Sequence, residues 1–245
     1  MTEEQLYKKF AGYYDKIYEK LDHEKESEFV KWAVNKHNGS DGNLLLDIAC
    51  GTGRHGYFLK DDFKILGVDI NEEMLKIARE KVHDVEFITG DMKKLNLGRK
   101  FDAVICMYSA ISYNITFEEL KLTLKNFYDH LNDKGVLIFD MGINKENWAE
   151  GNVSVDTVVD GNLKIARISK AYLENGILNS NFVFLIKDNG KIDFDIDEHK
   201  LGVFGIKEVN ELMENIGFET FIYSNFNDEL YEIGNGERPV FVGVK

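Results

Sequence analysis

Short apolar runs alternate with segments of helical periodicity up to about residue 150. The apolar runs lie at residues 44–48, 63–68, 85–88, 101–107 and 135–140. Run 101–107 is almost continuously apolar, as expected of a central parallel strand that is covered on both faces. The intervening segments, among them 24–36, 74–78 and 118–131, carry apolar residues at helical spacing. This alternation predicts an α/β fold with a parallel sheet.

Beyond residue 150 the pattern changes to alternating strands joined by hairpin turns. The pairs Asp160-Gly161, Asn175-Gly176 and Asn189-Gly190 are typical two-residue hairpin turns. They predict an antiparallel β-meander over roughly residues 153–204. In its last strand three isoleucine or phenylalanine residues alternate with three aspartates over 192–197, so we expect one apolar face and one solvated acidic face.

The chain then returns to the α/β pattern. A helix over 206–216 is predicted to end at Gly217, and segments 218–224 and 240–244 are predicted to be strands of the first sheet. The meander is therefore an insertion. We expect one Rossmann-like domain of residues 1–148 and 205–245, and an inserted antiparallel sheet of residues 149–204 that serves substrate binding and dimerisation.

The N-terminal segment is rich in tyrosine. From Leu6 to Leu21 its apolar residues lie near helical spacing. It is either an amphipathic helix packed on the core or a lid over a cofactor, in which Tyr13, Tyr14 or Tyr18 would face a cation.

Composition narrows the function. The formal charge of −13 disfavours nucleic acid as a partner, and no apolar run reaches the roughly 20 residues of a membrane helix. The polar N-terminus is unlike a signal peptide, so we expect a cytoplasmic protein. Cys50 and Cys106 lack the spacing of a metal or redox motif and are expected to be free thiols, and no metal site is expected.

The strongest chemical signal is the turn Asp47-Ile-Ala-Cys-Gly-Thr-Gly53, directly after the first predicted strand. Gly51 and Gly53 allow positive φ and close approach of a ligand to the main chain. With Gly56 the spacing is G-x-G-x-x-G, which also fits a dinucleotide. The carboxylate of Asp47 favours the cationic donor S-adenosylmethionine over a pyrophosphate. A turn that binds no ligand is the remaining alternative.

Two later strand ends also carry an acid. Asp69 follows the second strand, where a carboxylate can accept the hydroxyls of a bound ribose. Asp91 and Met92 follow the third strand, where a carboxylate and a backbone N–H can read adenine. The loop from Tyr108 to Tyr113, after the fourth strand, is expected to line the transfer site.

These features together resemble the class I S-adenosylmethionine-dependent methyltransferases and their seven-stranded sheet, over nearly the whole chain. Five pieces are similar to the N,N-dimethyltransferases of nucleotide-linked amino sugars: Tyr14-Asp-Lys-Ile-Tyr18, Leu97-Gly-Arg-Lys-Phe101, Cys106-Met-Tyr-Ser-Ala-Ile-Ser-Tyr113, His199-Lys-Leu-Gly-Val-Phe204 and Phe241-Val-Gly-Val244. Members of that family form homodimers through the inserted sheet, so the resemblance implies a homodimer.

The resemblance implies that Ala49, Asp69, Asp91, Met92 and Met107 contact the cofactor. It places Tyr18 near the acceptor amine and Arg238 near substrate phosphates. The full set of predicted cofactor-binding residues is Tyr14, Asp47, Ala49, Cys50, Gly51, Gly53, Asp69, Ile70, Asp91, Met92 and Met107. The predicted substrate-binding residues are Tyr18, Tyr113 and Arg238. The family has an aromatic run after the fifth strand, where this chain has Met141-Gly-Ile-Asn144.

Methyl transfer from this donor is an in-line displacement, so positioning can supply most of the rate. An amine must first lose a proton, which Tyr18 or His199 could accept. The leading hypothesis is therefore a small-molecule N-methyltransferase. A dehydrogenase, a non-catalytic sensor of the donor, and an O-methyltransferase are the alternatives. His199 as an ordinary strand residue and Arg238 as a surface charge also stay open.

Overall fold

A computed structural model describes residues 4–151 and 153–245. The chain forms two compact units. The larger contains Asp22–Trp148 and Val203–Lys245, and the smaller contains Ala149–Gly202 and the described residues before Asp22. The sequence had placed the segment before Asp22 in the Rossmann-like domain, whereas the structure groups it with the inserted sheet.

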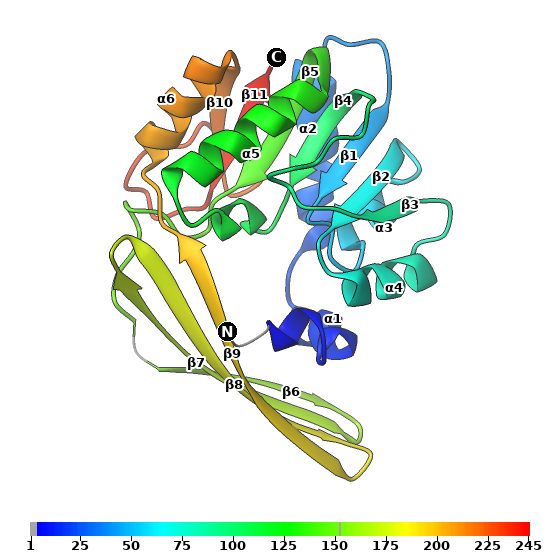
Figure 1. The fold of residues 1–245 in the computed structure, drawn as a ribbon, viewed down its shortest axis with the longest axis vertical. Coiled ribbons are helices and arrows are strands. Elements are labelled where there is room, and N and C mark those ends of the chain that lie inside the picture. Colours follow the sequence, from blue (N-terminus) through cyan, green and yellow to red (C-terminus); the bar gives the residue numbers. More distant parts are fainter. Residues whose placement is uncertain (1–3, 152) are drawn as a thin grey trace. The chain divides into compact units, whose positions relative to one another are not determined.

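A seven-stranded sheet forms the centre of the larger unit, in the order β10-β11-β5-β4-β1-β2-β3 (Figure 1). Its parallel strands are β1 (Leu44–Ile48), β2 (Lys64–Asp69), β3 (Glu86–Thr89), β4 (Phe101–Cys106) and β5 (Leu131–Asp140). Strand β11 (Pro239–Val244) pairs antiparallel with both β5 and β10 (Glu219–Ser224). The predicted α/β fold and the late return to the sheet are confirmed.

Helices cover both faces of this sheet. One face packs against α5 (Phe117–His130) and α6 (Ile206–Ile216), and the other against α2 (His23–His37) and α3 (Arg54–Leu59) (Figure 1). A further helix, α4 (Glu72–Lys81), packs against β2 and β3. In β4, Val104 and Cys106 belong to one cluster while Ala103 and Ile105 belong to the other. Because both faces are covered, this strand is apolar at every position except Asp102.

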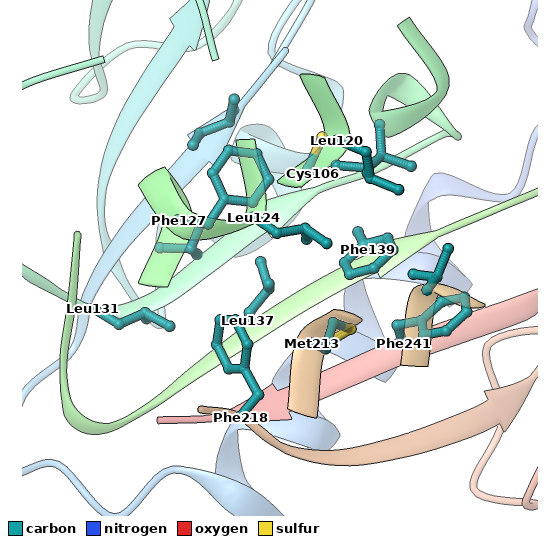
Figure 2. Close-up of a cluster of buried hydrophobic side chains, with 14 of the residues drawn as sticks. Cys106, Leu120, Leu124, Phe127, Leu131, Leu137, Phe139, Met213, Phe218 and Phe241 are labelled. Atoms are coloured by element: carbon teal, nitrogen blue, oxygen red, sulfur yellow. The ribbon is translucent and has the colours of Figure 1, made fainter. Parts of the chain in front are cut away.

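The core between α5, α6 and the sheet is shown in Figure 2. Phe139 of β5 and Phe241 of β11 face each other in the strand register, with ring centroids 4.9 Å apart and nearly parallel planes. Neither side chain is exposed. Burial of each ring stabilises the fold by about 1.5–3 kcal/mol. This pair therefore fixes the final strand beside β5 after the long insertion.

The smaller unit contains a four-stranded antiparallel sheet, β6 (Ser154–Asp160), β7 (Leu163–Glu174), β8 (Ile177–Asp188) and β9 (Lys191–Gly202). Asn175 and Gly176 both have positive φ, as do Asn189 and Gly190. Positive φ at both central residues is the type I′ geometry that suits tight hairpins. The predicted meander is thus confirmed.

The N-terminal segment is not one helix. It is broken into η1 (Gln5–Tyr7), η2 (Ala11–Tyr13) and the single turn α1 (Tyr14–Ile17). Leu6 and Phe10 are buried against Ile165, Phe184 and Ile186 of the inserted sheet. The backbone N–H of Leu6 donates to Asp197 Oδ2 at 2.8 Å. The carboxylate of Asp197, far away in the sequence, thus accepts a hydrogen bond from a backbone N–H of this segment.

The acidic face of β9 is only partly open to solvent, and its apolar face is largely exposed. Asp197 is fully buried beneath the N-terminal segment, and Lys9 Nζ lies 2.8 Å from Asp193 and 3.0 Å from Asp195. By contrast, Ile192 and Phe194 are 68% and 71% exposed. The expectation of a solvated acidic face holds for Asp193, whose side chain is 53% exposed, but is wrong for Asp197, because the N-terminal segment covers that end of the face.

Within the described residues, none of the helices has the length and apolar character required to cross a bilayer.

Candidate active site

The strand order reverses beside β1. From β1 the chain proceeds to β2 and β3 on one side and then returns to β4 on the other. In open parallel sheets, ligands bind outside the carboxyl ends of the strands at such a switch point. The glycine turn after β1 and the loop after β4 both lie at this edge.

The backbone of the glycine turn is strongly left-handed. Ala49, Gly51 and Gly53 have φ of 58°, 55° and 74°. The N–H of Gly53 donates to the carbonyl of Cys50 at 2.9 Å. A Cβ at Gly53 would lie 3.0 Å from the ring of Phe87, so both conformation and space require glycine. At Gly51 a Cβ would meet only the end of Met74, so this part of the turn leaves room for a ligand.

Asp69 holds the turn in place. Its Oδ2 accepts from the N–H of Gly51 and its Oδ1 accepts from the N–H of Asn71, each at 2.8 Å. The residue is 7% exposed, and burial raises its pKa although these backbone donors oppose the shift. A carboxylate has about four acceptor positions, so both oxygens can still accept ribose hydroxyls.

Asp47 is a buried acid with a strongly raised pKa. It is 2% exposed, and its Oδ2 has no hydrogen-bond partner. Burial raises its pKa to about 7, the charge of Asp69 adds to the shift, and His55 opposes it. A buried carboxylate with an unmatched oxygen costs stability unless a cationic or hydrogen-bonding group completes it. The site therefore fits the positively charged S-adenosylmethionine.

The other predicted cofactor residues differ in how their side chains are placed. The Cys50 side chain packs in the cluster of α4 and β3, and Met107 packs in the core with α2, so both are turned into protein. Ile70, after β2, is 62% exposed. Asp91 Oδ1 accepts from the N–H of Lys93, and Met92 Sδ accepts from Asn114 Nδ2 at 3.6 Å.

A second polar cluster lies at the ends of β4 and β5. Asp140 is fully buried and accepts from both the N–H and the hydroxyl of Ser109. Arg238 Nη1 lies 3.5 Å from Asp140 Oδ2, and the guanidinium lies 5.7 Å from the ring centre of Tyr108. Tyr108 and Ser109 both have positive φ, which is uncommon outside glycine and is enriched at functional sites. Arg238 is therefore paired and is not an ordinary surface charge.

Tyr113 ends the short 3-10 helix η3 (Ala110–Tyr113), directly after this loop. It is half-buried. It thus belongs to the same edge of the larger unit as Asp140 and Arg238, while its predicted contact with substrate stays a prediction.

Tyr14, Tyr18 and His199 belong to the smaller unit, and their roles in the reaction stay predictions. Arg167 Nη1 donates to the Tyr18 hydroxyl at 2.8 Å, and the rings of Tyr14 and Tyr18 lie 4.7 Å apart. Burial raises the pKa of Tyr18 although Arg167 opposes the shift. His199 Nε2 lies 3.1 Å from the buried carboxylate of Asp197.

Several contacts between polar groups were missed from the sequence. Arg167 beside Tyr18, Ser109 and Asp140 beside Arg238, and the buried group of His23, Glu26 and His55 all depend on contacts between distant segments. Only the last has a local signal, since His23 and Glu26 are three residues apart on one helix and His55 follows the glycine turn.

Comparison with known proteins identifies this arrangement. A family model described as a methyltransferase domain matches residues 45–135, from the second residue of β1, through the glycine turn, to the first half of β5. Together with the relatives below, this shows that the chain belongs to the S-adenosylmethionine-dependent methyltransferases. The predicted enzyme class and cofactor are confirmed.

Among its relatives, the chain is 33% identical to a dTDP-3-amino-3,4,6-trideoxy-alpha-D-glucopyranose N,N-dimethyltransferase of Streptomyces venezuelae, over 83% of this chain and 84% of the relative. It is 31% identical to a dTDP-3-amino-3,6-dideoxy-alpha-D-glucopyranose N,N-dimethyltransferase of Streptomyces fradiae, over 91% and 85%. The crystal structure of Streptomyces venezuelae DesVI superposes with a TM-score of 0.84 at 30% identity, covering 96% of this chain and 98% of DesVI.

Proposed function

We propose that the protein methylates an amine of a small molecule, with a nucleotide-linked amino sugar as the first acceptor to test. The observation that carries the proposal is the 33% identity, over 83% of the chain, to an enzyme named for dimethylation of such a sugar. The sequence-based expectation of a cytoplasmic location stays a prediction.

Each group of the larger unit has a distinct part in this proposal. Asp47 and the glycine turn bind the cationic end of the donor, Asp69 accepts from its ribose, and Asp91 with the main chain at Met92 binds its adenine. Bound S-adenosylmethionine supplies an electrophilic methyl group. The protein then needs chiefly to hold the amine in line with that methyl group.

The groups proposed to accept the amine proton lie in the smaller unit. The guanidinium of Arg167 donates to Tyr18, so the phenol oxygen is held in one direction by a charged donor. The carboxylate of Asp197 lies beside His199 and can hold its ring in one orientation. In this proposal His199 receives the proton, whereas Tyr18, a neutral phenol, relays it by passing its own hydroxyl proton to water as it takes up that of the amine.

Arg238 is the proposed contact for an anionic part of the acceptor. A Cβ at Gly142 would lie 3.2 Å from Arg238 Nη2 and 3.0 Å from Ser109 Oγ, so a larger residue there would displace the guanidinium. Glycine at position 142 therefore lets the guanidinium of Arg238 keep its position, in which an anionic part of the acceptor could reach it. The missing aromatic run over 141–144 widens the set of acceptors to be tested beyond nucleotide sugars.

A labelled-methyl screen tests the proposal. The purified enzyme would be incubated with radiolabelled S-adenosylmethionine and with dTDP-amino sugars, amino acids or polyamines. We expect label on an amine, and none on matched sugars that carry a hydroxyl in its place. Binding of the donor without transfer to any amine would refute the proposed function, and transfer to the hydroxyl compounds alone would indicate an O-methyltransferase.

We also propose that the enzyme is a homodimer formed through the open face of the inserted sheet. Cross-strand partners Val155, Ile168, Val183 and Ile196 form one row on that face. In the next row, Leu185 and Phe194 are 51% and 71% exposed. A contiguous apolar surface of this kind is typical of a protein contact. Lys164 and Lys187 lie in the following row, so the two apolar rows form a patch with a charged border. A second copy suits this patch because a two-fold axis through it would bring the apolar rows of both sheets together.

Replacing Phe194 with aspartate should convert the dimer to a monomer at micromolar concentration, because two buried charges would meet apolar surface. Light scattering would measure the mass. The control is Leu122→Asp on α5, where a leucine of comparable exposure, 61%, lies outside the sheet. A monomeric wild type, or a dimer that withstands Phe194→Asp, would contradict this prediction.

A further inference from the structure

Three potential metal ligands meet inside the larger unit. His23 and Glu26 lie one turn apart at the start of α2, and His55 lies in the first turn of α3. Their exposures are 7%, 5% and 6%. One ligand atom from each side chain lies within 4.8 Å of the other two. The cluster is thus built into the packing between two helices.

The distances fit a common metal position. His55 Nε2 lies 2.8 Å and His23 Nδ1 lies 3.3 Å from Glu26 Oε2. In a tetrahedral zinc site with bonds of about 2.0–2.1 Å, ligand atoms are about 3.3 Å apart. Small movements of the side chains would therefore place three ligands around one ion.

One nitrogen of the cluster lacks a hydrogen bond. His23 Nδ1 is buried and has no hydrogen-bond partner, although it lies 3.3 Å from Glu26 Oε2. A hydrogen bond between His55 and Glu26 would account for the burial of these two side chains, but it would leave His23 Nδ1 without a partner. A metal ion could be bound by all three side chains.

The composition of the cluster also suits a cation. Glu26 brings a carboxylate into a buried position between two imidazoles, and all three side chains are less than 10% exposed. Buried acidic groups of this kind are commonly paired with a cation or coordinate a metal ion.

We propose that His23, Glu26 and His55 form a binding site for a divalent transition metal ion, with Zn²⁺ as the ion to test. Two imidazoles and one carboxylate are a donor set that zinc uses, with a fourth position left open. An ion here would join the first turn of α2 to the helix that follows the glycine turn.

Calorimetric titration of Zn²⁺ into tag-free, chelator-treated full-length protein tests the site. We expect one equivalent to bind, and Glu26→Gln or His23→Asn to weaken binding by more than about tenfold, because even outer-shell changes cost 10–100-fold. Zn²⁺ at 100 times its Kd should raise Tm by about 5–10 °C. The exposed residue His83 provides the control variant His83→Asn.

His23→Asn leaves the hydrogen bond between His55 and Glu26 intact, so this variant is expected to fold. Circular dichroism would verify it. Absence of saturable Zn²⁺ binding, or equal binding by the wild type, Glu26→Gln and His23→Asn, would overturn the proposal. The test does not use activity, so it is independent of the proposed function.

Discussion

Replacing Asp69 with alanine is expected to weaken S-adenosylmethionine binding by about 100-fold, or about 2.7 kcal/mol. The substitution would remove the two proposed ribose contacts and also releases the N–H of Gly51, which Asp69 holds at 2.8 Å. Hydrogen bonds to a charged group contribute about 1.5–3 kcal/mol each, so the loss matches one to two of them. Calorimetric titration of the donor into both proteins measures the change.

Two variants separate this effect from general damage. Asp69→Asn keeps one acceptor oxygen, so its affinity for S-adenosylmethionine should lie between that of the wild type and that of the alanine variant. Asp61→Ala removes an exposed aspartate from the loop before β2 and should leave the affinity unchanged. An unaltered affinity in Asp69→Ala would show that the acid at the end of β2 does not bind the ribose.

The parts of the fold that depend on local pattern were predictable. The strands of the central sheet, the type I′ hairpins and the end of α6 at Gly217 follow from short stretches of sequence. The glycine turn was predictable for the same reason, since its chemistry is written in seven consecutive residues from Asp47. Local pattern fixes which residues share a face or a turn.

Local pattern does not fix what covers that face. Alternation over 192–197 separated apolar from acidic residues but could not show that Leu6, 191 positions from Asp197, would donate to it. Ser109 and Asp140 are 31 residues apart, and Glu26 and His55 are 29 apart. These contacts arise only when strands and helices pack, so no spacing in the sequence marks them.

We expect donor binding to depend on pH through Asp47. Its pKa is raised to about 7 by burial, so roughly half of the apo protein carries the neutral acid at pH 7. Only the carboxylate pairs well with a cationic ligand. We therefore expect affinity for S-adenosylmethionine to rise by up to about tenfold per pH unit below 7 and to level off above it. Titrations across this range would show a flat profile for Asp47→Asn if Asp47 is the group responsible.

The same substitution should stabilise the protein while it impairs binding. The pKa of Asp47 is 3.8 in an ordinary environment and about 7 in the folded protein. The folded state therefore loses stability as pH rises from about 3.8 to about 7, and the loss is constant above that pH. Asparagine avoids this cost, so Asp47→Asn should raise the unfolding free energy at pH 8 on the order of 2–4 kcal/mol, with little gain near pH 4. Denaturant titrations at both pH values, without donor, measure this difference. A variant that is less stable than the wild type at pH 8 would mean that the carboxylate of Asp47 is already compensated within the protein. The donor would then not be required to complete it.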